Sequence, residues 1–367
     1  MHDIDRQRLI GTFLDLVKIP SPSWKERAII EYITRVLRDL EIPYELFPCG
    51  ESHNLLARMG ATVPGTRGIA LSCHMDTVVP CDRVQPVVTP QRISSDGSTV
   101  LGSDDKAAVA ALLETMRVLQ ERKLPHGPVE FLFSCAEELG LYGIKGFNLA
   151  HLDSKFAFVL DSGGRVGRII LEAPYQSTIE VFIKGKAAHA GMEPEKGVSA
   201  IRVLSGILSS IPHGRIDKQT TANIGLISGG KATNIVAQEA WAKIEVRSID
   251  RKKLASIESK IYATVKDKAR AAGAKARLER RLEYSGFSLD KSSAVVRMAE
   301  KAVKSIGCKP AFESSGGGSD TNIINKAGIK AVNLSVGMMN VHTTNEYIMI
   351  RDLVGAGRLA LALVAGV

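Results

Sequence analysis

Acidic residues and histidines that could bind metal ions occur in five separate segments of the chain. Three of these segments follow short apolar runs of the kind that form buried strands, one precedes an apolar-periodic helix, and one lies near the C-terminus. Carboxylate and imidazole groups without thiolate form a ligand set that suits zinc, manganese or cobalt. The residues concerned are His74 and Asp76, Asp104 and Asp105, Glu137 and Glu138, Asp161, and His342.

Taken singly, each of these residues has an ordinary explanation as a loop histidine, a helix cap or a surface charge. Together they favour a site, because charged residues at the ends of several buried strands are costly unless they are paired or bound to metal. Two dications about 3.5–4 Å apart could share a hydroxide and polarise a carbonyl oxygen. One carboxylate must then stay free as a base, and the adjacent Glu137 and Glu138 offer one for metal and one for water.

The elements that must position these residues form an α/β pattern. Strands that alternate with helices imply a mostly parallel sheet with helices on both faces. The carboxyl ends of parallel strands meet at one edge, which is where open α/β sheets bind ligands. The pattern predicts strands at residues 68–73, 129–135, 156–160 and 331–336, and a helix at 107–122.

Helices are also predicted at residues 5–17 and 24–40, and Ser23 with Glu26 resembles a capping box for the second of them. Residues 172–284 differ in pattern from the rest of the chain. Alternating strands and two helices predict a small α+β insert, and the βα pattern resumes with a helix at 292–306. We therefore expect a discontinuous catalytic domain formed by residues 1–171 and 285–367, interrupted by the insert at 172–284.

Composition excludes several classes of protein. The chain has no apolar run near the roughly 20 residues of a membrane helix and no signal-peptide pattern, so we expect a cytoplasmic protein. Five scattered cysteines without a CxxC pair argue against disulfides and thiolate zinc sites. Residues 251–281 hold eleven basic and three acidic residues. Without interleaved aromatic residues, this segment predicts an amphipathic helix with a solvated basic face rather than a nucleic-acid site.

Six motifs, in order, resemble the peptidase T branch of the di-zinc peptidase family, which also contains carboxypeptidase G, aminoacylase and succinyl-diaminopimelate desuccinylase. The resemblance covers essentially the whole chain and implies a zinc peptidase-like catalytic domain with an inserted lid and dimerisation domain. The motifs are SCHMDTV, LGSDDKAAVAAL, SCAEELGLYG, VLDSGG, KAAHAG and VHTTNEYI.

The resemblance implies two zinc ions per subunit, with cobalt or manganese as substitutes. His74 and Asp161 would bind one ion, and Glu138 and His342 would bind the other. Asp104 would bridge both ions.

The resemblance also assigns roles around the metals. The peptide bond between Asp104 and Asp105 would be cis, and Asp76 would orient His74 through its second ring nitrogen. Glu137 would be the general base, which takes a proton from the water and passes it to the leaving amine.

Within the insert, His189 matches a family histidine that reaches into the active site of the partner subunit, which implies a homodimer. Asn234 and Arg247 match positions that contact substrate, and a guanidinium suits a peptide carboxylate. In the later glycine-rich loop, Gly317, Gly318 and Ser319 would cradle the substrate, since glycine allows close backbone approach.

Two positions bear on the substrate. Family members that act on free amino ends tend to have aspartate at the position of Asp161, which favours an aminopeptidase of di- and tripeptides. Gly316 replaces the arginine of peptidase T, which argues against a strict tripeptide preference. An N-acyl amino acid amidohydrolase or a carboxypeptidase with the same site is the alternative. A binding protein without catalysis would have no need of Glu137.

Overall fold

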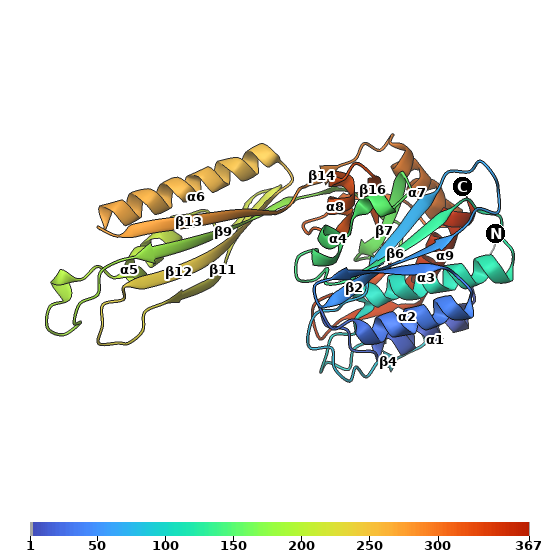
Figure 1. The fold of residues 1–367 in the computed structure, drawn as a ribbon, viewed down its shortest axis with the longest axis horizontal. Helices are drawn as coiled ribbons and strands as arrows, with labels where there is room; N and C mark the ends of the chain where they lie inside the picture. The colour runs from blue at the N-terminus through green and yellow to red at the C-terminus, as the bar shows by residue number, and fades with distance from the viewer. Residues whose placement is uncertain (1–2, 367) are drawn as a thin grey trace. The chain divides into compact units, whose positions relative to one another are not determined.

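The computed structural model describes residues 3–366, which fall into two compact units (Figure 1). The first unit consists of the chain up to Leu171, Ser288–Ser315 and the chain from Ser319 onward. The second unit consists of Glu172–Phe287 together with Gly316–Gly318. Each unit has its own hydrophobic core, as expected for separate domains.

The unit boundaries differ at two places from the pattern in the sequence. Residues 285–287 and 316–318 cluster with the second unit, although the sequence pattern places them in the catalytic domain. Gly318 lies against the ring of Tyr284, so closely that a Cβ atom on Gly318 would be 2.3 Å from the ring carbon Cζ. This contact helps to explain why the glycine-rich loop at residues 316–318 belongs to the second unit.

The first unit is built on a sheet that has nine strands within the described chain. The strands follow the order β1-β2-β6-β3-β7-β16-β8-β14, and β15 pairs with β8. Strands β6, β3, β7 and β16 run parallel, whereas β2 and β8 join them antiparallel. The elements are α1 (Arg6–Val17), α2 (Arg27–Asp39), β1 (Tyr44–Cys49), β2 (Ser52–Met59), β3 (Ile69–His74), β4 (Val87–Val88), β5 (Arg92–Ser94), α3 (Ser103–Glu121), β6 (Val129–Ser134), α4 (Tyr142–Gly146), a short 3₁₀ helix (Leu149–His151), β7 (Phe156–Ser162), β8 (Arg168–Ala173), β14 (Phe287–Ser288), α7 (Ala294–Ser305), β15 (Ala311–Ser314), α8 (Asp320–Lys326), β16 (Lys330–Ser335), β17 (Met338–Met339), β18 (Tyr347–Met349) and α9 (Ile350–Ala365).

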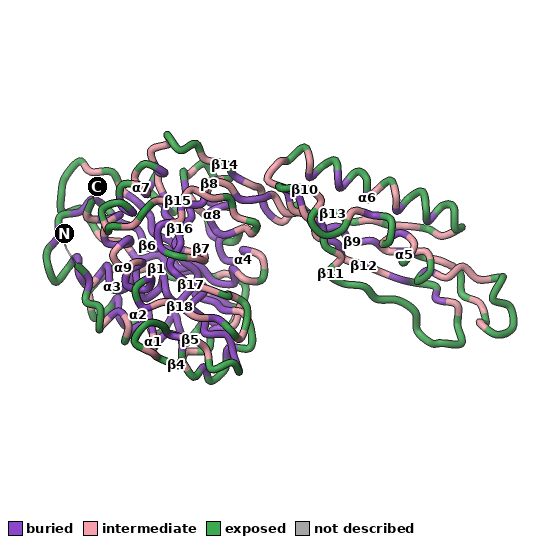
Figure 2. The backbone as a smooth tube through the Cα atoms, turned by 180° about the vertical axis from the view of Figure 1, so that it is seen from behind, coloured by how far each residue is buried: buried purple, intermediate pink, exposed green. Residues whose placement is uncertain are grey.

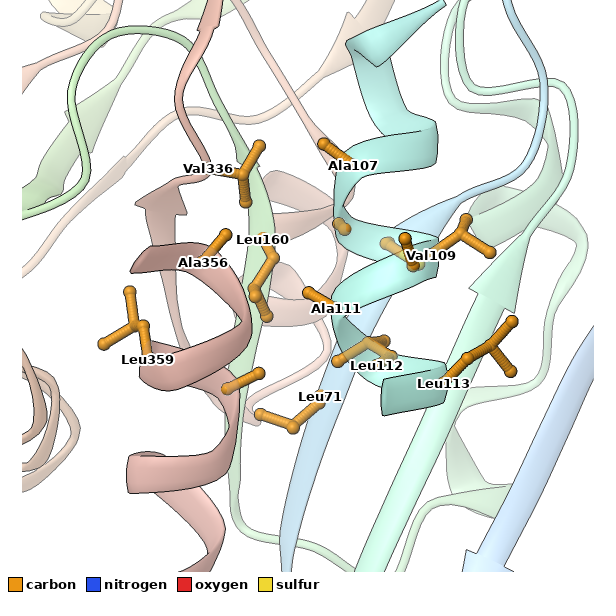
Figure 3. Packing of buried hydrophobic residues seen from close by; sticks show 14 of the residues in the cluster. Leu71, Ala107, Val109, Ala111, Leu112, Leu113, Leu160, Val336, Ala356 and Leu359 are labelled. Atoms are coloured by element: carbon orange, nitrogen blue, oxygen red, sulfur yellow. The ribbon is translucent and has the colours of Figure 1, made fainter. Parts of the chain in front are cut away.

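Strands β3 and β6 are buried along their whole length, which explains their continuous apolar sequences. Figure 2 shows β6 among the buried, purple segments of the first unit. Helix α3 is apolar on nearly all sides and packs beside α9. Figure 3 shows Ala111 of α3 and Ala356 of α9 close to Leu71 of β3 and Leu160 of β7. Small residues let these two helices approach each other over the sheet, and this packing holds the N-terminus of α3 near the strand ends.

The second unit is an antiparallel sheet with two helices on one face. The strand order is β10-β11-β12-β9-β13. Alternate residues of β9 and β12 are buried together with the apolar stripe of α6, so the basic residues of α6 face away from the sheet. The elements are β9 (Tyr175–Lys184), a 3₁₀ turn (Pro194–Lys196), α5 (Ala200–Leu208), β10 (Gly214–Asp217), β11 (Thr220–Gly229), β12 (Glu239–Ser248), α6 (Arg251–Ala271) and β13 (Lys275–Tyr284).

The α/β fold with an α+β insert is confirmed, and most predicted elements recur with boundaries shifted by a few residues. The basic helix predicted over residues 251–281 is an exception, because it ends at Ala271 and Lys275–Tyr284 form strand β13, which pairs with β9. One cap prediction is wrong. The N-cap of α2 is Glu26, and the Ser23 hydroxyl donates instead to Asp76 Oδ2 at 2.6 Å. Within residues 3–366, no helix combines the length and apolar character needed to cross a bilayer.

Candidate metal centre

The predicted ligands come together because three neighbouring strands end at the same edge of the sheet. His74 is the last residue of β3, which pairs in parallel with β6 and β7. Strand β6 leads into Glu137, and Asp161 lies one residue before the end of β7. Asp104 lies in the first turn of α3, and His342 lies three residues after β17.

Asp104 contacts both histidines, each through a different carboxylate oxygen. Its Oδ1 lies 3.0 Å from Nε2 of His74, and its Oδ2 lies 3.2 Å from Nε2 of His342. Asp161 Oδ1 lies 3.8 Å from the same nitrogen of His74, and Glu138 Oε1 lies 3.0 Å from that of His342. Two groups of donor atoms therefore share Asp104, and the atoms of each group lie within 4.8 Å of one another.

The electrostatics of this cluster fit divalent cations. Burial raises the pKa of Asp161 and of Glu137 well above its ordinary value, and neighbouring carboxylates raise it further. The pKa of Asp104 is instead held below its usual range, because contacts with His342 and His74 outweigh the effect of burial. Divalent cations would stabilise all of these groups as carboxylates, and the oxygen and imidazole donors suit such ions.

The two histidines differ in exposure, but the pKa of each ring is raised. Although burial opposes protonation of His74, its contacts with Asp104 and Asp76 raise the pKa of the ring. The bonds of His342 to Asp104 and Glu138 raise its pKa to about 10. The side chain of His342 is 52% exposed, whereas that of His74 is 2% exposed. Solvent therefore reaches the centre from the His342 side.

The peptide bond between Asp104 and Asp105 is cis, as the resemblance implies. Both residues have non-helical backbone angles although they lie in the first turn of α3. Asp105 is fully buried, and its Oδ2 accepts from the backbone N–H of His74 at 3.3 Å. Asp105 thus ties the start of the helix to the end of β3.

The turn that carries Glu137 is held by side chains from three distant elements. Four successive backbone N–H groups, at residues 135–138, donate to side-chain oxygens rather than to other backbone groups. Asn54 accepts from the first, Glu26 from the second and Asp76 from the last two, at 2.9–3.1 Å. Ala136 has a φ of 46°, a conformation that needs such support.

Asp76 therefore has a broader role than the one predicted. The ring nitrogen Nδ1 of His74 lies 3.0 Å from the backbone oxygen of Asp76 and 3.4 Å from its carboxylate. The carboxylate itself accepts from the N–H groups of Glu137 and Glu138. An Nδ1–H that donates to the backbone oxygen leaves Nε2 with its lone pair toward Asp104. Asp76 thus positions His74 and the Glu137 turn together.

Ser319, which was predicted to contact substrate, lies at the start of α8. It is buried and forms the N-cap of α8 in a capping box with Asn322. Its hydroxyl also accepts from Asn333 Nδ2 at 3.1 Å. These contacts give the serine a structural role at the helix start, and its predicted contact with substrate stays a prediction. Gly317 and Gly318 belong to the second unit.

The remaining predicted residues all lie in the second unit. Nδ1 of His189 accepts from two backbone N–H groups, each at 3.2 Å, which leaves Nε2 as the ring nitrogen without a backbone contact. Arg247 forms a two-point contact with Glu245, at 2.6 and 3.1 Å. The backbone oxygen of Asn234 accepts from Ala190 N–H at 2.9 Å.

Sequence reasoning missed the side chains that support the centre. Asn333 in β16 accepts from the backbone N–H of Asp161 at 3.1 Å and donates to its backbone oxygen at 3.0 Å. Asn54 and Glu26 hold the Glu137 turn. The sequence did contain a signal for the two asparagines, because a polar amide within an apolar segment must form hydrogen bonds when it is buried. Glu26 had none, since a glutamate near a helix start is common.

Two family profiles match parts of the chain. The profile described as "Peptidase dimerisation domain" matches residues 176–273, within the second unit. The profile described as "Peptidase family M28" matches residues 54–197, which include the strands that carry the centre.

Whole-length relatives also match. The uncharacterized protein YqjE of Bacillus subtilis (strain 168) is 39% identical over 366 residues, which is 98% of each chain. The crystal structure of aminopeptidase PepT from Bacillus cereus ATCC 10987 is 38% identical, with a TM-score of 0.88, and the match covers 99% of this chain and 98% of that one. A tripeptidase from Staphylococcus aureus subsp. aureus Mu50 is 37% identical, with a TM-score of 0.93 over the same shares.

Proposed function

The chain belongs to the peptidase T-like branch of the M20 family of metal-dependent peptidases, and we propose that it releases the N-terminal residue from di- and tripeptides. The observation that carries this proposal is the double contact of Asp104 with His74 and His342. A carboxylate that faces two separate donor groups is what a two-metal hydrolase requires.

We propose zinc for both metals, with cobalt or manganese as substitutes. His74 and Asp161 would hold one ion, Glu138 and His342 would hold the other, and Asp104 would contact both. When bound, such ions supply Lewis acidity toward the scissile carbonyl and lower the pKa of water. The donor set contains imidazole and carboxylate only, which fits these metals.

Glu137 is the general base in this proposal. It is 9% exposed, and its backbone N–H is fixed by Asp76. Burial and the charge of Asp161 raise the pKa of its carboxyl, so the group holds a proton more readily than a surface glutamate. A base of this kind can take a proton from the attacking water and deliver it to the leaving amine.

The preference for a free amino end rests on Asp161 and on the relatives. An aminopeptidase PepT and a tripeptidase are 38% and 37% identical to this chain. Arg247 would contact the substrate carboxylate, but it is already paired with Glu245. By the resemblance to peptidase T, Gly316 stands where that enzyme would have arginine. A weak requirement for the carboxyl end, and hence tolerance of different peptide lengths, follows from these two features.

The dimerisation-domain match supports a homodimer. In the proposed dimer, His189 acts in the partner's active site through Nε2, the nitrogen left free by its backbone contacts. Mixing two inactive variants, Glu137→Gln and His189→Ala, tests this. Subunit exchange should restore up to a quarter of the activity, because one site of each mixed dimer would have both residues. Mixtures as inactive as their parents would contradict the shared site.

The function is tested with zinc-loaded protein and di-, tri- and tetrapeptides, each with a free and an acetylated amino end. Products are identified by mass, with a chelator control. We expect release of the first residue from free-amine peptides only, and no release after chelation. Faster cleavage of acetylated substrates would instead assign the site to a deacylase or carboxypeptidase. A metal-loaded protein that cleaves nothing in the panel would contradict hydrolysis.

A further inference from the structure

Glu346 is a buried carboxylate that joins two of the segments that carry the metal ligands. It is 1% exposed and lies four residues after His342. Its Oε2 accepts from the backbone N–H of Gly102 at 2.8 Å. Its Oε1 accepts from the Ser103 hydroxyl at 2.5 Å and from the backbone N–H of Asp104 at 3.1 Å. Three donors from the start of α3 therefore meet one side chain from the far end of the chain.

The start of α3 needs this partner. Gly102 is the N-cap, with a φ of 74°, and it offers no side chain to accept from the first N–H groups. Asp104 and Asp105 depart from helical angles, so the usual bonding of the first turn is interrupted. N–H groups at a buried helix start require acceptors from elsewhere. Glu346 supplies them at the residue whose two oxygens face the two histidines.

The segment from Asn340 to Glu346 is itself held by local bonds. Thr343 Oγ1 donates to the backbone oxygen of Asn340 at 2.7 Å, and Glu346 N–H donates to that of Thr343 at 3.2 Å. Asn340 and His342 both have a positive φ, of 54° and 62°. Because this segment is tightly bent and held by its own bonds, a shift of Glu346 would also shift His342.

We propose that Glu346 is a positioning residue that fixes Asp104 relative to His342 and thereby sets the affinity for the ion that these two share with Glu138. The inference rests on the proposed metal centre. Glu346 does not bind the ion in this role, because both of its oxygens are occupied by the α3 donors.

The test is calorimetric titration of the chelator-treated, full-length protein with Co²⁺, together with the visible absorption of the bound ion. We expect the wild type to bind two ions. Glu346→Ala should weaken the ion shared with His342 and Glu138 about 10- to 100-fold, the usual effect of losing a residue that orients ligands. The other ion shares only Asp104 with it and should be weakened less. The absorption of the weakened ion should change, since its ligands are no longer held in the same geometry.

The Co²⁺ affinity of Glu346→Gln should lie between that of the wild type and that of Glu346→Ala. Glutamine keeps an acceptor for Ser103 and Asp104, but its amide group would face the N–H of Gly102. This variant retains the size of the side chain, so it also serves if the alanine variant does not fold.

Glu130 offers a matched control. It is 5% exposed, and its carboxylate accepts from the backbone N–H groups of Asp153 and Ser154 at 3.1 and 2.9 Å. Glu130→Ala removes contacts of the same kind away from the metal ligands. We expect it to lower the melting temperature without changing either Co²⁺ affinity.

The outcomes separate the two proposals. A wild type that binds fewer than two Co²⁺ ions would overturn the metal centre itself. A wild type that binds two, with unchanged affinities in Glu346→Gln and in any folded Glu346→Ala, would overturn the role of Glu346 alone. Equal weakening in the Glu130 and Glu346 variants would also overturn it, because the effect would then be general loss of stability.

Discussion

Asp104 and Glu137 are both buried carboxylates, yet their surroundings move their pKa values in opposite directions. Asp104 lies between two histidines, which favour its charged form. Glu137 lies beside Asp161 and Glu138, which disfavour its charged form. The two carboxyl groups are thereby suited to different tasks, that of Asp104 to metal binding and that of Glu137 to proton exchange.

Replacement of Glu137 by glutamine tests this division. The backbone bond to Asp76 is kept and only the proton acceptor is lost. We expect kcat to fall by about 10²- to 10⁴-fold, the usual share of a general base, with little change in KM. Metal content, measured by mass spectrometry of the elements, should stay at the wild-type value. More than a tenth of wild-type turnover would remove Glu137 from the base role.

The raised pKa values also predict how the chelated protein responds to pH. The pKa of His342 is about 10 in the folded protein, against about 6.5 for an unfolded histidine. Its contribution to stability is therefore full below about pH 6.5 and is lost as the pH rises through 10. The raised pKa values of Asp161 and Glu137 act in the same sense, because the folded state binds more protons.

We therefore expect the melting temperature of the chelated protein to fall between pH 6.5 and pH 10. Zinc should remove much of this slope, because the ions replace the protons. Thermal melts across this range, with and without zinc, give the comparison, and His342→Ala should flatten the curve of the chelated protein. A chelated protein that becomes more stable over this range would contradict the electrostatics of the centre.

At the scale of residues, the grouping of the proposed ligands could be predicted from the sequence because each follows a strand or begins a helix. The supporting contacts could not. Glu26, Asn54 and Asn333 act on backbone groups that are 110, 81 and 172 residues away. Nothing local in the sequence marks such a pair, and the Ser23 pattern was misread as a cap because its actual partner, Asp76, is also distant.

At the scale of elements, α4 sets the position of the Glu137 turn by direct backbone contact. A Cβ atom on Gly143 would lie 1.9 Å from the backbone oxygen of Cys135. The Asn54 side chain joins the two segments, since it accepts from Cys135 N–H and donates to the backbone oxygen of Gly143. The turn therefore packs so closely against the start of α4 that only glycine fits at position 143.

Gly143→Ala should consequently damage both stability and activity. The clash must be relieved by backbone movement, so we expect a loss of more than about 2 kcal/mol in the free energy of unfolding. The kcat should fall with it, because the displaced turn carries Glu137. Urea unfolding and peptide cleavage measure the two effects.

Gly11→Ala is the control for this variant. Gly11 lies inside α1 in the same unit, and nothing lies within 4 Å of the position of its Cβ. Alanine there should stabilise the protein by about 0.5–1 kcal/mol, because it favours the helix. If Gly143→Ala behaved like Gly11→Ala, the packing of α4 against the turn would be refuted.

Prediction of elements succeeded where the apolar pattern was long or strongly periodic, as in β3, β6 and α3. It missed β1, β2 and β13. Strand β13 is mostly exposed and rich in charge, so it was read as a continuation of the basic helix. Its identity as a strand comes from pairing with β9, a tertiary contact that overrides local preference.

At the scale of the whole molecule, two hydrophobic cores lie in one chain, and all the proposed metal ligands belong to the first unit. Proteins with separate cores depart from a single unfolding transition. We expect two transitions by scanning calorimetry. A chelator should lower the midpoint of one only, since a ligand stabilises the fold that binds it.

The second transition can be assigned by Gly206→Ala. This glycine lies inside α5 of the second unit, where nothing lies within 4 Å of the position of its Cβ. The substitution should raise the transition that the chelator leaves unchanged. One joint transition that shifts as a whole in both experiments would show that the two cores unfold together.

The place of β16 has a consequence for synthesis of the chain. This strand lies between β7 and β8, yet the ribosome makes it only after the whole second unit. His342 emerges later still, 181 residues after Asp161. At about 5–20 residues per second, this delay lasts roughly 10–40 s. During translation the proposed ligands His74, Asp104 and Asp161 are therefore made well before His342, so the proposed centre can be completed only after residue 342 has emerged.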